Sequence, residues 1–276
     1  MNHIVLICGR SGSGKTTILN NLRNLVKTEI NDDVSIVFPK LYTTRPKREN
    51  ETDEEYIFVS DEEFESKRNQ MMHVSEYDTT SGIWKYGVMM DYSSWYGTST
   101  NGFAILPVNL DGYFPMSRWL KKYNRTAKNS ERIKMDVIYI YTKPVDVLIR
   151  SMKRELEKPK EKQDFAEILR RYQTETDKNY CTPGLKFNAF YCLDSFEYAI
   201  GSMLDVEELS GVPIDSSSFA STIRGVMDKH VNMLNFEDKD ASKDFHCFHS
   251  IDGNQELLSK NVLKSILDLN KPKPKE

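Results

Sequence analysis

Residues 9–16 read Gly-Arg-Ser-Gly-Ser-Gly-Lys-Thr, a complete match to the phosphate-binding pattern G-x-x-x-x-G-K-[ST]. The apolar run Ile4–Cys8 precedes this loop, and the segment Thr17–Leu22, which suits a helix, follows it. This order of strand, loop and helix directs unpaired backbone N–H groups and the positive end of the helix dipole toward one point. The sequence therefore predicts a site for the phosphates of a nucleoside triphosphate; a loop kept only for packing is the alternative.

The residues of this loop divide into groups with different roles. Lys15 would reach the β- and γ-phosphates of ATP, and the hydroxyl of Thr16 would hold Mg²⁺. ATP and Mg²⁺ are accordingly the expected cofactors. The residues expected to bind the ATP phosphates are Gly9, Ser11, Gly12, Ser13, Gly14, Lys15, Thr16 and Thr17.

The composition is that of a globular protein. The chain has 276 residues, of which 39% are hydrophobic, and its net charge is −3 with a pI of about 6.0. No overall positive field would attract nucleic acid, so any site for a polyanion must be local. The four cysteines show no paired spacing, and the sequence has neither a signal-peptide pattern nor an apolar run long enough to span a membrane. We therefore expect a cytoplasmic protein that does not enter membranes.

Apolar strand-like runs alternate with helical patterns along the chain, which is typical of an α/β fold with a parallel sheet covered by helices. These runs are Ile4–Cys8, Val34–Phe38, Phe103–Asn109, Val137–Tyr141 and Ala189–Cys192.

Two stretches interrupt this alternation. A polar stretch from about residue 42 to 100 contains a short strand at Tyr56–Val59 and a helix that opens with a capping box formed by Ser60 and Glu63. The segment Met116–Lys134 is rich in Lys and Arg, and we expect an exposed loop or helix there rather than core.

The polar stretch also carries a series of ordered motifs. Thr43-Thr44-Arg45-Pro46-Lys47-Arg48 is followed by Tyr56–Ser60 and then by Glu62-Glu63-Phe64. In this order, and together with the phosphate-binding loop, the motifs resemble the guanylate kinase family over residues 1–205. The resemblance implies a P-loop kinase fold with an acceptor-binding lobe at about 42–100 and a lid at about 150–175. It also implies transfer of a phosphoryl group from ATP to a nucleoside monophosphate.

By the same resemblance, the acceptor phosphate would be bound by Arg45, Arg48, Tyr56 and Tyr86. Guanidinium groups and phenol hydroxyls can together donate charge-assisted hydrogen bonds to a phosphate dianion. Surface arginines paired with the acidic run at 49–55 are the alternative. Tyr96 could replace Tyr86 in the family's Tyr-Gly pattern, but Tyr86 is favoured because Gly102 then falls at the turn before the next strand.

Arginines in the lid would stabilise charge on the moving phosphoryl group. Arg150 and Arg154 are four residues apart and share one helix face, although a charged solvent-facing helix would have the same spacing. With the lid's Arg171, the resemblance assigns roles in phosphoryl transfer to five residues. They are Lys15, Arg45, Arg150, Arg154 and Arg171.

The positions that would read guanine depart from the family. His73 stands where the family has a glutamate, unless a shift of three residues brings Glu76 there instead. A neutral imidazole has one donor and one acceptor, so it cannot accept two N–H groups as a carboxylate does. The family's hydroxyl positions become Leu41 and Val88, and Asn109 replaces an acidic residue. These changes predict an acceptor with a different or modified base, or a phosphorylated sugar, although an ordinary half-buried histidine is also consistent with the sequence.

The resemblance ends near residue 205. Residues 206–276 are expected to form a helical extension with a disordered tail, including one helix from about Asp215 and another spanning Leu257–Leu267. These helices could mediate oligomer formation. The cluster His246, Cys247 and His249 is only a weak zinc signal.

Two further kinds of function stay open. A kinase acting on a polynucleotide would bind the backbone of the polynucleotide along the basic segment Met116–Lys134. A non-catalytic guanylate-kinase-like interaction module would bind a partner without turnover, but such modules typically lack a working phosphate loop.

Overall fold

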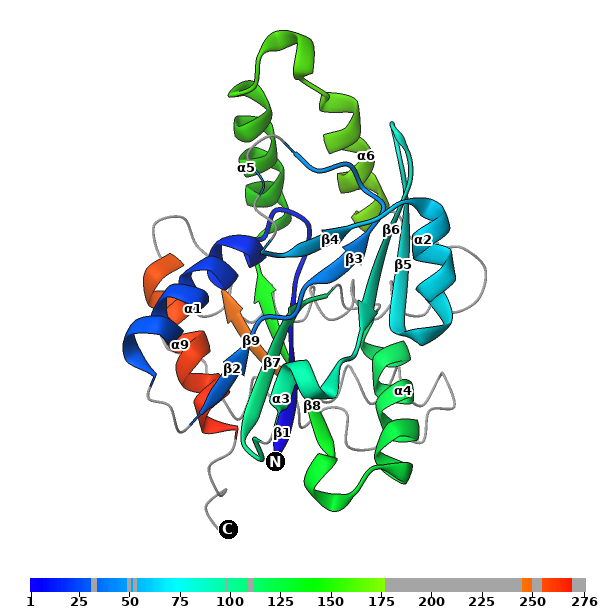
Figure 1. Cartoon of the computed structure of the whole chain (residues 1–276). Helices are drawn as coiled ribbons and strands as arrows, with labels where there is room; N and C mark the ends of the chain where they lie inside the picture. Colours follow the sequence, from blue (N-terminus) through cyan, green and yellow to red (C-terminus); the bar gives the residue numbers. More distant parts are fainter. Residues whose placement is uncertain are drawn as a thin grey trace. The chain divides into compact units, whose positions relative to one another are not determined.

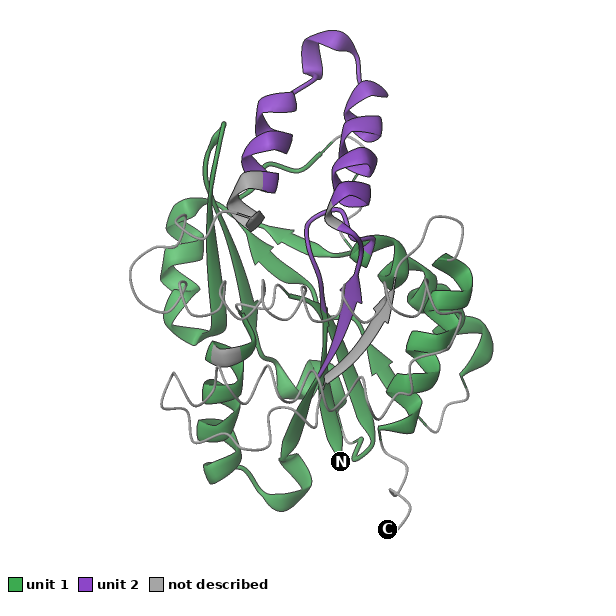
Figure 2. Cartoon of the chain, turned by 180° about the vertical axis from the view of Figure 1, so that it is seen from behind, with its two compact units in different colours: residues 1–7, 15–136, 252–276 green, residues 8–14, 137–251 purple. Residues whose placement is uncertain are grey.

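We describe the protein from a computed structural model. It describes residues 1–30, 34–48, 51, 54–97, 99–108, 112–176, 245–249 and 255–269. The chain divides into two compact units (Figure 2). Unit 1 comprises residues 1–7, 15–136 and 252–276, and unit 2 comprises residues 8–14 and 137–251.

The first sheet of unit 1 is parallel, as the apolar strand pattern predicts. Strand β7 (Gly102–Pro107) pairs on one side with β1 (Asn2–Cys8) and on the other with β2 (Ser35–Val37). The residues of β1 are all buried, as expected for a parallel strand covered on both faces. Helix α1 (Lys15–Glu29) packs against α9 (Gln255–Asp268), and Figure 1 shows the two side by side. A parallel sheet with flanking helices is therefore confirmed.

The second sheet of unit 1 has four strands in the order β4-β3-β6-β5. Strands β3 (Leu41–Thr43) and β4 (Tyr56–Phe58) are parallel, whereas β5 (Met71–Thr79) and β6 (Gly82–Met89) form an antiparallel hairpin. Antiparallel pairing between β3 and β6 completes the sheet.

Further helices of unit 1 pack against one of its two sheets. Helix α2 (Asp61–Lys67) is followed by the 3-10 turn η1 (Arg68–Gln70), and α2 is capped by the hydroxyl of Ser60, which accepts from the backbone N–H of Glu63 at 3.2 Å. This contact is the first half of the predicted capping box. The other helices are α3 (Tyr92–Tyr96), which packs against β7, and α4 (Tyr113–Thr126), which packs against β5 and is followed by the 3-10 turn η3 (Asn129–Glu131).

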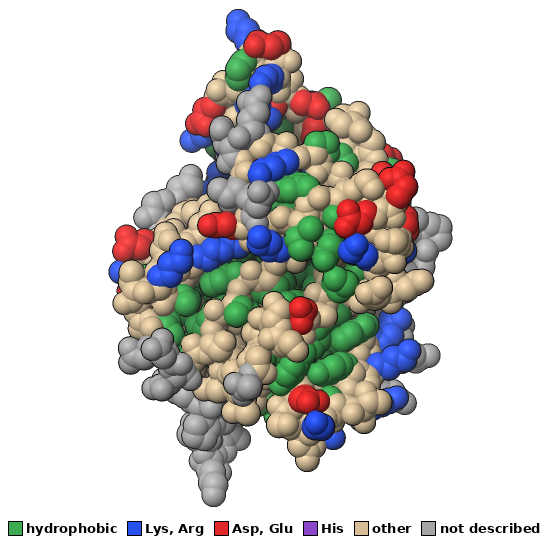
Figure 3. All heavy atoms as spheres, viewed as in Figure 1, with side chains coloured by type: hydrophobic (Ala, Val, Ile, Leu, Met, Phe, Trp, Pro, Cys, Tyr) green, Lys and Arg blue, Asp and Glu red, His purple; other side chains and the backbone are tan. Residues whose placement is uncertain are grey.

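Strand β8 (Ile133–Tyr141) begins in unit 1, where Asp136 Oδ2 lies 2.6 Å from Nδ1 of buried His3. In unit 2, β8 pairs in parallel with β9 (Phe245–His249). The rest of unit 2 is a helical hairpin of α5 (Pro144–Leu156), the 3-10 turn η4 (Lys160–Lys162) and α6 (Phe165–Thr176). Figure 3 shows acidic and basic side chains interspersed at the tip of this hairpin.

Several expectations from the sequence need correction or stay untested. Met116 and Leu120 are buried on α4, so the basic segment is not wholly an exposed excursion, although its Lys and Arg side chains do lie at the surface. The helix expected over Leu257–Leu267 is α9, and it packs on α1 within unit 1. The strand at Ala189–Cys192, the helix from Asp215 and the boundary at 205 lie outside the described residues. No helix in the described part of the chain is long and apolar enough to cross a membrane.

Candidate active site

The phosphate-binding loop leads directly from β1 to the first residue of α1, Lys15. Gly9, Gly12 and Gly14 have φ values of 148°, 87° and 95°, a region that favours glycine. A Cβ at Gly9 would also lie 2.5 Å from the carbonyl oxygen of Ile140. At these three positions the loop thus has a backbone conformation that favours glycine, as the sequence predicts.

The side chains of the loop differ in burial. Ser13 is fully buried, and its Oγ has no hydrogen-bond partner among the described residues. Ser11 and Lys15 are half-buried, whereas Thr16 and Thr17 are exposed at the start of α1. The exposed hydroxyl of Thr16 and the glycine-lined backbone fit a metal-bound polyphosphate. No group of three His, Cys, Asp or Glu side chains that could hold a metal occurs among the described residues.

Within unit 2, helix α5 packs against Gly12. A Cβ at Gly12 would lie 3.1 Å from Ser151 Oγ, 3.2 Å from Val147 Cγ1 and 3.6 Å from Arg154 Nη2. The hydroxyl of Thr142 donates to the carbonyl of Ser13 at 3.2 Å and ties the end of β8 to the loop. The structure therefore brings one predicted lid arginine, Arg154, next to the phosphate-binding loop.

The other two predicted lid arginines are on the same hairpin. Arg150 lies one helical turn before Arg154 on α5 and is half-buried. Arg171 lies on α6, where its Nε donates to Glu167 Oε1 at 2.7 Å. Glu167 also accepts from Arg170, so one buried carboxylate holds two neighbouring arginines.

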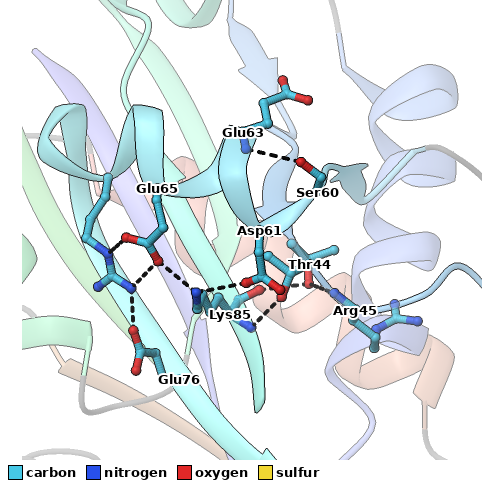
Figure 4. Close-up of polar contacts among 10 residues, drawn as sticks. Thr44, Arg45, Ser60, Asp61, Glu63, Glu65, Glu76 and Lys85 are labelled. Atoms are coloured by element: carbon cyan, nitrogen blue, oxygen red, sulfur yellow. Dashed lines mark hydrogen bonds and ion pairs between the residues drawn. The ribbon is translucent and has the colours of Figure 1, made fainter. Parts of the chain in front are cut away.

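In unit 1, the turn that carries Arg45 is clamped to Lys85 on β6. The backbone of Thr44 donates to the carbonyl of Lys85 at 3.1 Å, and the hydroxyl of Thr44 accepts from the backbone N–H of Lys85 at 3.0 Å (Figure 4). The hydroxyl of Thr43 donates to the same carbonyl at 2.9 Å and accepts from the backbone N–H of Arg45 at 3.2 Å. The two threonines of the motif thus fix the place at which Arg45 leaves the sheet.

Aromatic rings and an acid surround Arg45. Its guanidinium carbon lies 5.2 Å from the ring centre of Tyr56 and 5.5 Å from that of Phe58. Its Nη2 donates to Glu51 at 2.5 Å and its Nη1 donates to the carbonyl of Pro46 at 2.9 Å. The sequence does not predict the contact with Glu51, since nothing in the spacing distinguishes this residue within the acidic run.

Tyr56 and Tyr86 are brought together beside Arg45, as the resemblance predicts. Their ring centres lie 6.0 Å apart, and Tyr86 pairs across the sheet with Thr43. Burial, with a smaller contribution from Tyr86, raises the pKa of Tyr56 to about 12, so its hydroxyl stays protonated and able to donate. Tyr96, the other candidate, is buried on α3 and donates to the carbonyl of His3 at 2.8 Å, so its hydroxyl is engaged elsewhere.

Strand alternation separates His73 from Glu76. His73, Ser75 and Tyr77 share one face of β5, because successive side chains on a strand point to opposite faces. Tyr86 lies directly opposite Ser75 and its ring lies 5.6 Å from that of Tyr77, so this is also the face that carries Tyr86. The half-buried ring of His73 therefore shares a sheet face with the arginine–tyrosine cluster.

Glu76 points to the opposite face, toward α2. There it accepts a hydrogen bond from Arg68, which also donates to Glu65 at 2.6 Å. Glu65 and Glu76 are labelled in Figure 4. Glu76 therefore does not share the sheet face of His73 and Tyr86, on which the alternative register would need it.

The remaining positions complete this face. Val88 pairs with His73, and both Val88 and Leu41 are buried. His73 Nε2 lies 2.6 Å from Ser75 Oγ, a contact that the sequence analysis missed although the two-residue spacing of a strand signals a shared face. Arg48 is exposed, and Asn109 lies outside the described residues, as do the side chains of His246, Cys247 and His249.

The parallel sheet and the glycine-rich loop at the start of α1 define an α/β protein of the P-loop class. The sequence model of the family "Guanylate kinase" matches residues 1–87. The chain is also 28% identical over 159 residues to the guanylate kinase of Thermotoga maritima, covering 56% of this chain and 65% of that protein. It is 37% identical over 67 residues to the guanylate kinase of Lawsonia intracellularis, covering 24% of this chain and 28% of that protein. The chain is thus similar to guanylate kinases, and the family model matches its first 87 residues.

The likeness is partial. The chain spans less than two thirds of the length of either of these two relatives. The crystal structure of guanylate kinase from Anaplasma phagocytophilum covers 77% of this chain and 97% of its own chain, with 15% sequence identity and a TM-score of 0.35.

Proposed function

We propose that this protein is an ATP-dependent kinase that transfers the γ-phosphoryl group of ATP to the phosphate of a nucleoside or deoxynucleoside monophosphate. The observation that carries the proposal is that the chain combines a complete phosphate-binding loop with the cluster of Arg45, Tyr56 and Tyr86. The first feature suits a triphosphate donor and the second a monophosphate acceptor.

The chemistry needs mainly position and positive charge, because the transferred phosphoryl group spreads charge over its oxygens in the transition state. Lys15 would contact the β- and γ-phosphates. Arg154, which lies beside Gly12, would stabilise the developing charge together with Arg150 and Arg171. When bound, Mg²⁺ would neutralise phosphate charge, and Thr16 would hold it from the start of α1.

On the acceptor side, Arg45 and Arg48 would bind the monophosphate with the hydroxyls of Tyr56 and Tyr86. The raised pKa of Tyr56 supports a donor role, since the hydroxyl stays protonated at neutral pH. The acceptor differs from plain GMP in this proposal, because the sheet face next to this cluster presents His73, Leu41 and Val88 in place of a carboxylate and hydroxyls. A base with a different hydrogen-bonding edge fits this face better than guanine does.

An ADP-release assay with ATP and Mg²⁺ tests the proposal against a panel of ribo- and deoxynucleoside monophosphates. The panel includes modified bases, ribose bisphosphate and a short oligonucleotide, so that sugar and polynucleotide kinases register as separate outcomes. Lys15→Ala is expected to abolish ADP release. Lys27→Ala is the matched control, since Lys27 is exposed in the last turn of the same helix.

Three outcomes would overturn parts of this proposal. Strong preference for GMP or dGMP would show that the altered face still reads guanine. Turnover confined to ribose bisphosphate or the oligonucleotide would replace the acceptor class. Absence of turnover with every acceptor, together with partner binding that Lys15→Ala leaves unchanged, would favour an interaction module.

A further inference from the structure

Glu51 contacts both arginines that are expected to bind the acceptor phosphate. Its Oε1 accepts from Arg45 Nη2 at 2.5 Å, and its Oε2 accepts from the backbone N–H of Arg48 at 3.2 Å. The backbone N–H of Glu51 donates in turn to the carbonyl of Arg48 at 3.2 Å. One carboxylate therefore joins the side chain of the first arginine to the backbone of the second.

The guanidinium of Arg45 is held on several sides. It is 4% exposed and lies over the rings of Tyr56 and Phe58. Glu51 binds one terminal nitrogen and the carbonyl of Pro46 binds the other, which fixes the plane of the group. A guanidinium has five N–H donors, and these two contacts use two of them. The group can therefore still donate to a phosphate.

Glu51 is anchored as well as charged. Burial works against its ionisation, but the hydrogen bonds from Arg45 and from the backbone of Arg48 outweigh this effect and keep the pKa of Glu51 below its ordinary value. A carboxylate tied to the backbone of its own loop is a fixed part of that loop. A phosphate that displaced it would break the contact with Arg48 as well as the one with Arg45.

We propose that Glu51 is a positioning residue for acceptor binding: it orients Arg45 and fixes the Arg45–Arg48 turn so that both arginines present donors to a monophosphate. This inference rests on the proposed function and adds to it a residue that does not itself touch the acceptor. A competing arrangement, in which Glu51 occupies the place of the phosphate, makes the opposite prediction. Removing the negative charge would then strengthen anion binding rather than weaken it.

The test measures binding of ribose 5-phosphate by calorimetry, because this probe carries the monophosphate ester without a base and needs no turnover. Glu51→Gln removes the charge and keeps the size of the side chain. We expect the dissociation constant to rise about ten-fold, the loss that corresponds to about one charge-assisted contact. Glu51→Asp should recover part of this loss. In the ADP-release assay, KM for the acceptor should rise while KM for ATP stays unchanged.

Glu55→Gln is the matched control. Glu55 lies in the same loop with similar side-chain exposure, 13% against 18%, but its carboxylate pairs with Arg23 at 3.6 Å. Equal binding by Glu51→Gln and Glu55→Gln would overturn the positioning role alone, provided that the wild-type protein binds and turns over a monophosphate. Tighter binding by Glu51→Gln would overturn it in favour of competition. Failure of the wild-type protein to bind the probe would overturn this inference, and failure to transfer a phosphoryl group as well would overturn the proposed function.

Discussion

His73 and Ser75 lie on the same face of β5, and His73 Nε2 is 2.6 Å from Ser75 Oγ. The contact leaves this part of the sheet with an imidazole–hydroxyl pair, and a neutral imidazole by itself has one acceptor where a carboxylate has two accepting oxygens. The ring of His73 is also close to Gly112, since a Cβ there would lie 2.8 Å from its Cδ2 and 3.0 Å from its Nε2. The side chain at position 73 is thus held on the sheet face that, in the proposed function, lies next to the acceptor-binding cluster.

Replacing His73 by Glu is expected to increase selectivity for guanine. A carboxylate there could accept from the ring N–H and the exocyclic amine, and hydrogen bonds to a charged group contribute about 1.5–3 kcal/mol each. We expect kcat/KM for GMP, relative to the best other monophosphate, to rise at least about ten-fold. The control is Glu76→Gln, which alters the carboxylate on the opposite face of β5. A change in the relative kcat/KM for GMP in Glu76→Gln would contradict this register of β5.

The two candidate tyrosines give a matched pair of variants. Tyr86→Phe should raise KM for the acceptor about ten-fold while leaving the free energy of unfolding almost unchanged, because it removes one hydrogen bond to phosphate. Tyr96→Phe should instead lower the free energy of unfolding by about 1–3 kcal/mol, since it leaves the buried carbonyl of His3 without its 2.8 Å partner. Steady-state kinetics and urea unfolding measure the two effects. The reverse pattern would restore Tyr96 as the acceptor residue.

The sequence predicts the parallel strands and the phosphate-binding loop because apolar runs and glycine spacing are local signals. It does not predict the β5–β6 hairpin. Polar residues such as His73, Ser75 and Lys85 occupy both faces of the hairpin, so the alternation of polar and apolar residues that identifies a strand is weak. The choice between His73 and Glu76 depends on pairing with β6, and pairing partners cannot be read from spacing alone.

Contacts between residues far apart in the sequence account for the other features that the sequence does not predict. The clamp of Thr43 and Thr44 on Lys85 joins segments about forty positions apart, so the motif shows the residues but not what holds them. For α9, the helical pattern is evident from the sequence, but its contact with α1 is not. Asn21 on α1 donates to Ser259 on α9 at 3.2 Å, across most of the length of the chain.

The ion pairs on the α2 side of the second sheet give a prediction about pH. Hydrogen bonds from Arg68 and then Lys85 lower the pKa of Glu65 to about 2 from 4.5 (Figure 4). A lowered carboxyl pKa gives stability that is present above the unfolded value of about 4.5 and is lost as the pH falls toward 2. Arg68→Gln should therefore raise the pKa of Glu65, as measured by a carbon-13 NMR titration.

The control for this titration is Lys67→Gln, because Lys67 pairs with Glu63 at 3.0 Å. This variant should leave the pKa of Glu65 where it is. The gain in stability from such exposed pairs is small, so the titration is a better measurement than the melting temperature. An unchanged pKa of Glu65 in Arg68→Gln would contradict the network.

Alanine variants of Gly12 and Gly82 distinguish the effect of backbone strain from the effect of contact with α5. Both have positive φ, 87° and 113°, so alanine should cost about 1–2 kcal/mol of stability at either position. A Cβ at Gly82 meets nothing within 4 Å, whereas at Gly12 it would lie 3.1 Å from Ser151 and 3.2 Å from Val147. We therefore expect Gly12→Ala, but not Gly82→Ala, to weaken ATP binding about ten-fold, measured by calorimetry, because only at Gly12 does the added Cβ crowd α5. Equal ATP affinity in the two variants would mean that the contact between Gly12 and α5 does not hold the loop in its phosphate-binding form.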